Sequence, residues 1–353
     1  MLFTASTVKD TLPNLERFVA GNLAGGVDHL VVFLDAPRET DPEARAFLDG
    51  HPSVTCVPTD RAWWQGDRPD QLNARQRINA NLVKALLSPF GWADWVFHID
   101  ADEIVQIDRA ALAAAPEDAR VATLAPLEAV SQPEWVGDPT HFKRLLDKDD
   151  LTLLHTLGVI DRPHNGAYFH GHVDGKVGVR PDLDVWLTLH HAVDADKQEI
   201  EPWAHPGLRL RHYESFSGEE FVRKWTSILE AGPNVGFRPA REPTAVALRT
   251  LIGKGLRPAQ ARPYLMRIFE RTTQDDLVTL RDLGLLEEID PRAGTHRSAD
   301  FPAGGREQLG LLLDALREAP KRSFHPGYPA ADVRRLLDEA GGVTEARRSP
   351  RRS

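Results

Sequence analysis

Apolar, β-prone runs alternate with helix-like segments along the first hundred residues, and this alternation limits the folds open to the chain. Four such runs are present, at residues 2–8, 29–35, 54–57 and 95–99. Three segments between them have the apolar spacing of amphipathic helices, at residues 12–23, 41–48 and 71–87. The repeated strand–helix–strand order predicts a mostly parallel sheet with right-handed crossovers and helices on its faces.

Beyond this region the pattern is weaker. A short helix is expected at 109–114, and strand-like stretches lie at 121–124, 173–181, 185–190 and 208–212. Residues 134–172 are expected to be irregular and loop-rich. Helical spacing returns at 217–229, 245–252, 259–271, 274–283, 306–318 and 330–339. We therefore expect an α/β domain at 1–230, a helical C-terminal extension at 231–345 and a disordered basic tail at 346–353.

Composition narrows the class of protein. The 353 residues are 41% hydrophobic and 27% charged, as in soluble globular proteins, and the formal net charge is −9. An acidic surface disfavours nucleic acid and anionic membranes as general partners. The single cysteine, Cys56, excludes an internal disulfide and a cysteine-based zinc site, which suits a cytoplasmic location. No stretch approaches 18 apolar residues and no signal-peptide pattern is present, so contact with the inner membrane face would be peripheral.

Three carboxylates follow the apolar run at residues 95–99. They are Asp100, Asp102 and Glu103. Charges are not easily buried within a strand, so these acids should lie where the strand leaves the sheet. In an open α/β sheet that is the edge at which ligands bind. Two carboxylates at i and i+2 can converge on a hard cation such as Mg²⁺ or Mn²⁺. A solvated acidic turn is the alternative for an isolated Asp-x-Asp.

Other nucleotide-binding motifs are missing from the sequence. No glycine-rich GxGxxG and no P-loop follows any of the expected strands, which disfavours a dinucleotide dehydrogenase and a Walker-type NTPase.

The order of these parts resembles GT-A-type glycosyltransferases, in particular family 2-like and family 92-like bacterial proteins. The resemblance rests on residues 75–79, 95–104, 175–181, 190–191 and 212–224. It implies a Rossmann-like GT-A fold and an enzyme of polysaccharide biosynthesis that moves a sugar from a nucleotide-sugar donor to a hydroxyl acceptor, with inversion. The acceptor would be a glycan, a lipid-linked molecule or another hydroxyl compound. The sequence departs from family 2 at Lys9-Asp10 and at residues 35–41, which puts base and ribose contacts from that region in doubt.

The resemblance also implies a metal site built on the acidic segment. A Mn²⁺ or Mg²⁺ ion would neutralise the leaving diphosphate as a Lewis acid. Asp102 is the expected direct ligand. Asp100 would bind the ion through water or hold the sugar or ribose, and His212 is a candidate third ligand. Glu103 is as well explained by a structural ion pair.

Five further residues are expected to bind the donor. Asp35 ends the second strand, Arg75 and Asn79 lie one helical turn apart, and Lys176 and Arg180 share one face of a predicted strand. The two basic residues could reach the diphosphate. The alternatives are a bracing role for Arg75 and Asn79 behind the acidic turn and a solvated strand face for Lys176 and Arg180. Trp63 and Trp64 either stack on a sugar or base, or pack under their loop.

The general base is not singled out by the sequence. Glu134, His190 and His191 are candidates, and Asp174 is a weaker one. A histidine taken alone is more often a structural residue.

Two other classes of function stay open. One is nucleotidyl transfer on a similar core, which the sequence of residues 5–10, ASTVKD, disfavours because it contains no glycine and one lysine. The other is a non-catalytic carbohydrate-binding or scaffolding relative.

Overall fold

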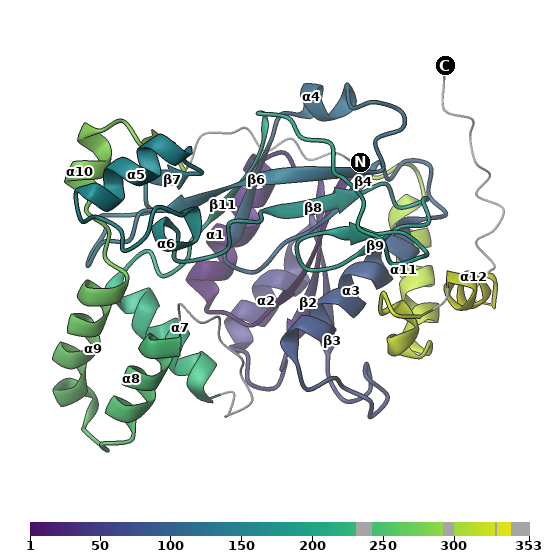
Figure 1. Ribbon diagram of the computed structural model, residues 1–353. Helices are drawn as coiled ribbons and strands as arrows, with labels where there is room; N and C mark the ends of the chain where they lie inside the picture. Colours follow the sequence, from purple (N-terminus) through teal and green to yellow (C-terminus); the bar gives the residue numbers. More distant parts are fainter. Residues whose placement is uncertain (231–241, 292–299, 329, 340–353) are drawn as a thin grey trace. The chain divides into compact units, whose positions relative to one another are not determined.

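The computed structural model describes residues 1–230, 242–291, 300–328 and 330–339. The chain divides into two compact units (Figure 1). The first unit comprises Met1–Ala125, Asp174–Leu210 and Gly294–Ser353, and the second comprises Pro126–Val173 and Arg211–Ala293. The basic tail at 346–353 lies outside the described residues.

A mostly parallel sheet forms the centre of the first unit. Its parallel strands are β1 (Leu2–Val8), β2 (His29–Asp35), β3 (Val54–Thr59) and β4 (Trp95–His98), in the order β3-β2-β1-β4. β8 (Lys176–Val179) pairs antiparallel with β4, and the beginning of β6 (Val121–Ala129) pairs antiparallel with β8. The expected parallel sheet is confirmed for the four strands of the first hundred residues.

Helices cover both faces of this sheet because its strands are apolar on both sides. Leu30, Val32 and Leu34 of β2 face α1 (Leu12–Ala24) and α2 (Pro42–Gly50). Val31 and Phe33 of the same strand face α3 (Leu72–Leu87). The period-two alternation of β2 thus supplies two cores, as expected for a strand buried on both faces.

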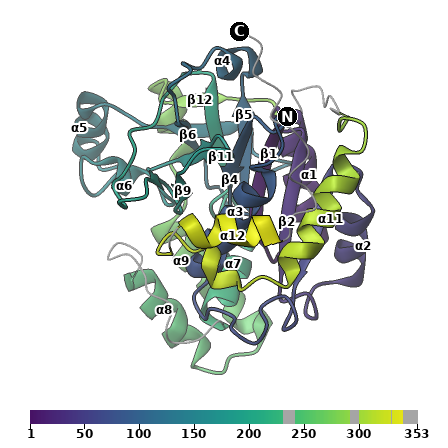
Figure 2. The same cartoon turned by 90° about the vertical axis from the view of Figure 1, so that its right-hand side faces the viewer.

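The C-terminal helices of the first unit add to the same core. α11 (Gly305–Arg317) packs Leu309, Leu312 and Leu316 into the cluster that contains α3, and α12 (Ala330–Glu339) adds Val333 (Figure 2). The 3₁₀ helix η1 (Lys321–Phe324) lies between them in sequence and buries Phe324. α11, η1 and α12 therefore pack into the core of the first unit, whereas the sequence analysis placed them in a helical C-terminal extension at 231–345.

Short elements complete the first unit. They are β5 (Glu103–Ile107), α4 (Arg109–Ala113) and a two-stranded hairpin of β9 (Trp186–Leu187) and β10 (Ala192–Val193). β11 (Leu208–His212) begins in the first unit and ends in the second, as β6 does. The sequence did not predict β5, because its acidic start was interpreted as a strand exit.

The second unit has a smaller antiparallel sheet and six helices among its described residues. The sheet joins the end of β6 to β7 (His141–Arg144) and β7 to β12 (Leu286–Glu288). The helices are α5 (Lys148–Thr156), α6 (Asn165–Tyr168), α7 (Gly218–Glu230), α8 (Glu242–Ile252), α9 (Pro258–Thr272) and α10 (Leu277–Asp282). Residues 134–172 were expected to be irregular and loop-rich, and most of them are, but the segment also contains β7, α5 and α6. α5 buries only Leu151 and Leu154, which gives a weak helical pattern.

The order of the parallel strands reverses within the first unit. The chain steps from β1 to β2 and β3 in one direction, then returns and places β4 on the other side of β1. Such a reversal separates the connections that leave the carboxyl ends of β1 and β4, and ligands of open α/β sheets bind there. The acidic segment 100–103 follows β4 directly, so it lies at this point. No helix among the described residues is long and apolar enough to cross a membrane.

Gly25, just after α1, allows the close approach of that helix to β5. A Cβ atom at Gly25 would collide with the backbone carbonyl of Val105. The Asn22 side chain fixes this approach, because it accepts from Val105 N at 2.9 Å and donates to Glu103 O at 3.1 Å.

We expect Gly25→Ala to destabilise the protein by about 1–3 kcal/mol, because a backbone oxygen cannot move aside without shifting β5. Urea unfolding followed by circular dichroism measures the effect. Gly50→Ala is the control, since a Cβ at Gly50 meets nothing within 4 Å. Equal stability of the two variants would contradict the assigned packing of α1 on β5.

Candidate functional site

Asp100 is held by two side chains at the carboxyl edge of the sheet. Gln76 Nε2 of α3 donates to Asp100 Oδ1 at 2.5 Å, and Lys176 Nζ of β8 donates to Asp100 Oδ2 at 2.6 Å. The backbone N–H of Asp100 donates to Glu103 Oε2 at 2.6 Å. These contacts close the turn between β4 and β5 and fix Asp100 from three directions.

Lys176 is the cation of this acidic turn. Its side chain is 1% exposed, and Nζ lies 3.7 Å from Glu103 Oε2 and 3.3 Å from the carbonyl oxygen of Leu189. Burial opposes the charge of Lys176, but Asp100 and Glu103 raise its pKa above the usual range. Glu103 therefore has a structural ion pair, which is one of the two roles the sequence allowed.

The electrostatics of the turn keep Asp100 ionised. Burial alone would raise the pKa of Asp100, but Lys176 and His98 more than offset it and lower the pKa to about 2. His98 is fully buried, and burial lowers its pKa to about 4, so its ring is neutral at pH 7. Asp102 is half-buried, so part of it stays in contact with solvent.

Asp35 ends β2 in a clamp of two arginines. Arg75 of α3 donates bidentately to it, from Nε at 3.2 Å and from Nη2 at 2.8 Å, and Arg68 Nη2 donates to Oδ1 at 2.9 Å. Arg75 Nη1 also donates to the carbonyl oxygens of Pro69 and Asp70. The sequence did not single out Arg68, although it lies in the polar loop expected over the sheet edge.

Asn79 lies one turn along α3 from Arg75 and binds a different strand. Its Nδ2 donates to Thr7 Oγ1 of β1 at 2.9 Å. Both side chains are buried. The pair therefore braces the carboxyl ends of β1 and β2, whereas the alternative given above was bracing of the acidic turn after β4.

Trp63 and Trp64 are packed into the core of the first unit. They are 3% and 1% exposed. The ring of Trp63 lies 5.6 Å from that of Phe33, and Lys321 Nζ lies 4.5 Å from its centroid. Burial leaves no face of either ring for a sugar or a base, so the packing alternative holds.

The structure separates Arg180 from Lys176. Arg180 lies just beyond the end of β8, where its guanidinium stacks on Trp95 at 4.7 Å and donates to the carbonyl oxygen of Ala119 at 3.2 Å. Trp95 begins β4, whereas Asp100 follows the other end of that strand. Arg180 therefore lies at the amino edge of β4, away from Lys176, and its role in donor binding stays a prediction from the sequence. Side chains at i and i+4 share a strand face but lie about 13 Å apart along it.

The two neighbouring histidines have different surroundings. His190 is half-buried, and its Nδ1 lies 2.8 Å from the carbonyl oxygen of Gly175. Burial, followed by the charge of Lys176, lowers the pKa of His190. His191 is exposed and its Nδ1 lies 2.8 Å from Glu199 Oε1. Only His190 is thus placed beside the Lys176–Asp100 pair.

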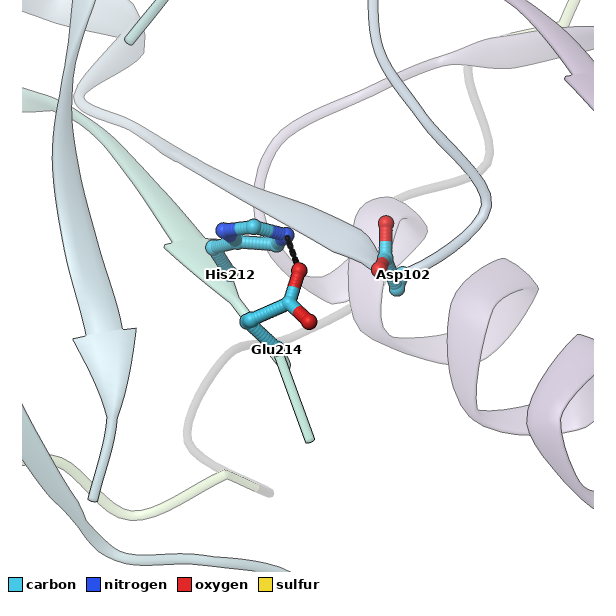
Figure 3. A group of neighbouring side chains, drawn as sticks. All are labelled: Asp102, His212 and Glu214. Atoms are coloured by element: carbon cyan, nitrogen blue, oxygen red, sulfur yellow. Dashed lines mark ion pairs between the residues drawn. The ribbon is translucent and has the colours of Figure 1, made fainter. Parts of the chain in front are cut away.

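His212 belongs to the second unit, at the end of β11. Its Nε2 lies 3.7 Å from Glu214 Oε2, and the same carboxylate accepts from Lys224 Nζ at 2.6 Å (Figure 3, which also draws Asp102 of the first unit). His212 and Glu214 are both buried. Glu134, the remaining predicted site residue, is exposed in a loop of the second unit.

A second buried charge network was not predicted from the sequence. Lys143 of β7 is fully buried, and its Nζ lies 2.9 Å from Glu128 Oε1 and 3.0 Å from Asp275 Oδ1. Burial opposes ionisation of both Lys143 and Asp275, yet their mutual attraction raises the pKa of Lys143 and lowers that of Asp275 to about 2. Within the second unit this network joins residues that are far apart in sequence.

Comparison with known proteins gives little further guidance. No family model and no curated protein matches the chain. HddC from Yersinia pseudotuberculosis is similar over 51% of this chain and 76% of its own, with 11% identity and a TM-score of 0.24. The apo structure of the bifunctional glycosyltransferase WbbM is similar over 51% of this chain and 31% of its own, with 15% identity and a TM-score of 0.21. Scores this low support neither a fold nor an activity for the chain.

We expect Lys176→Met to destabilise the protein by about 3–5 kcal/mol at neutral pH, because it leaves Asp100 and Glu103 buried without a cation. The folded-state pKa of Asp100, about 2, lies below its ordinary value of 3.8. Its contribution to stability is therefore present above pH 3.8 and is lost as the pH falls toward 2.

Urea unfolding at pH 7 and at about pH 3 tests both parts of this prediction. The difference between wild type and Lys176→Met should shrink at the lower pH. Lys148→Met, at an exposed lysine of α5, is the matched control and should be close to neutral. A difference that does not depend on pH would contradict the assigned ion pair.

Proposed function

We propose that the chain is a metal-dependent glycosyltransferase that moves a sugar from a nucleotide-sugar donor to a hydroxyl acceptor, with inversion. The observation that carries the proposal is the position of the acidic turn 100–103. It follows β4 at the reversal of strand order, where open α/β sheets bind their ligands. The resemblance of the sequence to GT-A-type enzymes agrees with this position.

The residues of the turn suit a hard divalent cation. Carboxylate oxygens are the donors that Mg²⁺ and Mn²⁺ prefer. Each oxygen of Asp100 already accepts a hydrogen bond, from Gln76 and from Lys176. We propose Asp102, which is half-buried, as the direct ligand, as the sequence led us to expect. Asp100 acts through water or holds the sugar or ribose. When bound, the cation neutralises charge on the leaving diphosphate.

The protein's own residues orient the donor in this proposal. Lys176 and Gln76 hold Asp100 in one orientation, so the turn is fixed before the donor arrives. Arg75 and Arg68 fix Asp35 at the end of β2. Arg68 is 41% exposed on its side chain, so it is the member of this clamp placed to meet a phosphate.

His190 is the base we favour for the acceptor hydroxyl. Nδ1 is engaged by the carbonyl oxygen of Gly175, and the lowered pKa keeps the ring neutral at pH 7. A neutral ring with Nδ1 as donor carries its lone pair on Nε2, the atom that would accept a proton. Glu134 and His191 stay predictions from the sequence, and both are exposed.

The test uses Asp102→Asn, which keeps the shape of the side chain and removes its charge. Calorimetry with UDP and with GDP, each with Mn²⁺, should show metal-dependent binding to the wild type. The variant should bind at least about tenfold more weakly, as losses at a metal site typically do. Asp118→Asn, at an exposed loop residue of the same unit, is the matched control. Wild-type affinity in Asp102→Asn, or binding that EDTA does not affect, would contradict the metal role.

The products distinguish the alternative functions. A glycosyltransferase incubated with nucleotide sugars and Mn²⁺ releases a nucleoside diphosphate. A nucleotidyltransferase given a nucleoside triphosphate and a sugar phosphate releases pyrophosphate. A binding relative releases neither although it binds the ligand.

The sequence-based assignment of His212 as a third ligand is part of the proposal. His212→Gln should weaken Mn²⁺ binding about tenfold or more, because a neutral amide is a poorer ligand than imidazole. Mn²⁺ electron paramagnetic resonance titration measures this, and His205→Gln, at an exposed histidine, is the control. Unchanged Mn²⁺ affinity in His212→Gln would remove this residue from the ligand set and leave Asp102 in place.

A further inference from the structure

A cavity of about 200 Å³ lies in the first unit beside α3, away from the acidic turn. Three segments line it: the second half of α3, residues 181–186 and α12. The residues of α12 that face the cavity are Val333, Arg334 and Leu337. Figure 2 shows α12 on the side of the unit where α3 lies. The cavity is smaller than the 300–1,000 Å³ typical of sites for drug-sized ligands, so it has no room for a nucleotide sugar.

Lys84 is the polar side chain that this cavity leaves unsatisfied. The residue lines the cavity and is 8% exposed. In the described part of the chain its ammonium has no hydrogen bond and no ion pair. Its one close contact there is the ring of Trp186, 5.5 Å from Nζ to the centroid. A buried charge without a partner is costly. Asn81, the neighbouring polar side chain in the cavity lining, is instead hydrogen-bonded to both backbone groups of Leu187.

The charges around Lys84 limit what could pair with it. Asp182 and Asp184 line the same cavity and are exposed, and Asp184 forms an ion pair with Arg334. Burial lowers the pKa of Lys84 to about 8, against the attraction of these two acids. The ammonium is thus charged at pH 7. A ligand with two negative charges would be repelled by the acids, whereas a single carboxylate can pair with Lys84 alone.

The other walls of the cavity are apolar and one is aromatic. Trp186, Leu183, Val333 and Leu337 supply them. Such walls favour a compact apolar group attached to the charged end of the ligand. We propose that this cavity binds a small organic monocarboxylate, with its carboxylate on Lys84 and its apolar group against Trp186 under α12.

Benzoate is the probe that tests this site, because it joins one carboxylate to a flat ring. Binding to the full chain is measured by saturation-transfer NMR and by quenching of tryptophan fluorescence. Benzyl alcohol is the matched neutral probe and inorganic phosphate is the multiply charged one. We expect benzoate to bind the wild type at least about tenfold more tightly than either. Benzyl alcohol cannot form a charge pair with Lys84, and phosphate is repelled more strongly than benzoate by Asp182 and Asp184. Its affinity should fall as the pH rises through about 8, where Lys84 loses its proton.

Lys84→Met keeps the length of the side chain and removes the charge, and it should weaken benzoate binding about tenfold or more. Lys148→Met is the control and should leave the affinity unchanged. Circular dichroism confirms that both variants are folded. Benzoate binding that is absent in the wild type, or equal in Lys84→Met, overturns the proposal. Phosphate binding that exceeds benzoate binding and depends on Lys84 overturns the ligand class. None of these outcomes depends on Mn²⁺ or Asp102, so they are separate from the test of the proposed transferase.

Discussion

The buried ammonium of Lys176 is the interaction on which the carboxyl edge of the first unit depends. It lies 2.6 Å from Asp100 Oδ2 and 3.7 Å from Glu103 Oε2, the two acids that begin and end the turn between β4 and β5. Without this cation, the buried Glu103 and the half-buried Asp100 would raise each other's pKa. Because β8 runs antiparallel beside β4, its first residue reaches this turn. The reversal of strand direction therefore supplies the cation that keeps the acidic turn ionised.

Many strands and helices of the first unit could be predicted because each one is specified by the residue pattern of its own segment. Strands β1 to β4 and helices α1 to α3 begin and end within a few residues of their expected limits, since each apolar run or amphipathic pattern is long. The misses are short or weakly patterned. β5 opens with Glu103, whose charge is compensated by a lysine more than 70 residues away, and α5 has only two buried apolar residues. The packing of α11 against α3 joins segments that are far apart in the sequence. The apolar spacing within each helix does not indicate which helix it packs against.

The candidate site shows the same division between local and distant information. Asp35, Arg75 and Asn79 could be selected from their places at a strand end and on one helix face. The ion pair between Arg75 and Asp35, which lie 40 residues apart in the sequence, could not be predicted in this way. Lys176 and Arg180 were predicted to share a strand face, but Lys176 begins β8 and Arg180 follows its last residue. The distance along a strand separates two such side chains even where their direction agrees.

Three of the four lysines that are buried among the described residues show how the surroundings of a charge indicate its role. Lys143 and Lys176 each meet two carboxylates, and in both cases the attraction outweighs burial and raises the lysine pKa. In both networks the protein's own carboxylates compensate the charge of the lysine. Lys84 is buried to a similar degree, but its acids are too exposed to compensate, and its pKa falls to about 8. Lys143 and Lys176 therefore have carboxylate partners within the protein, whereas Lys84 faces a cavity without one among the described residues. An anionic ligand would therefore stabilise the charge of Lys84 more than that of Lys143 or Lys176.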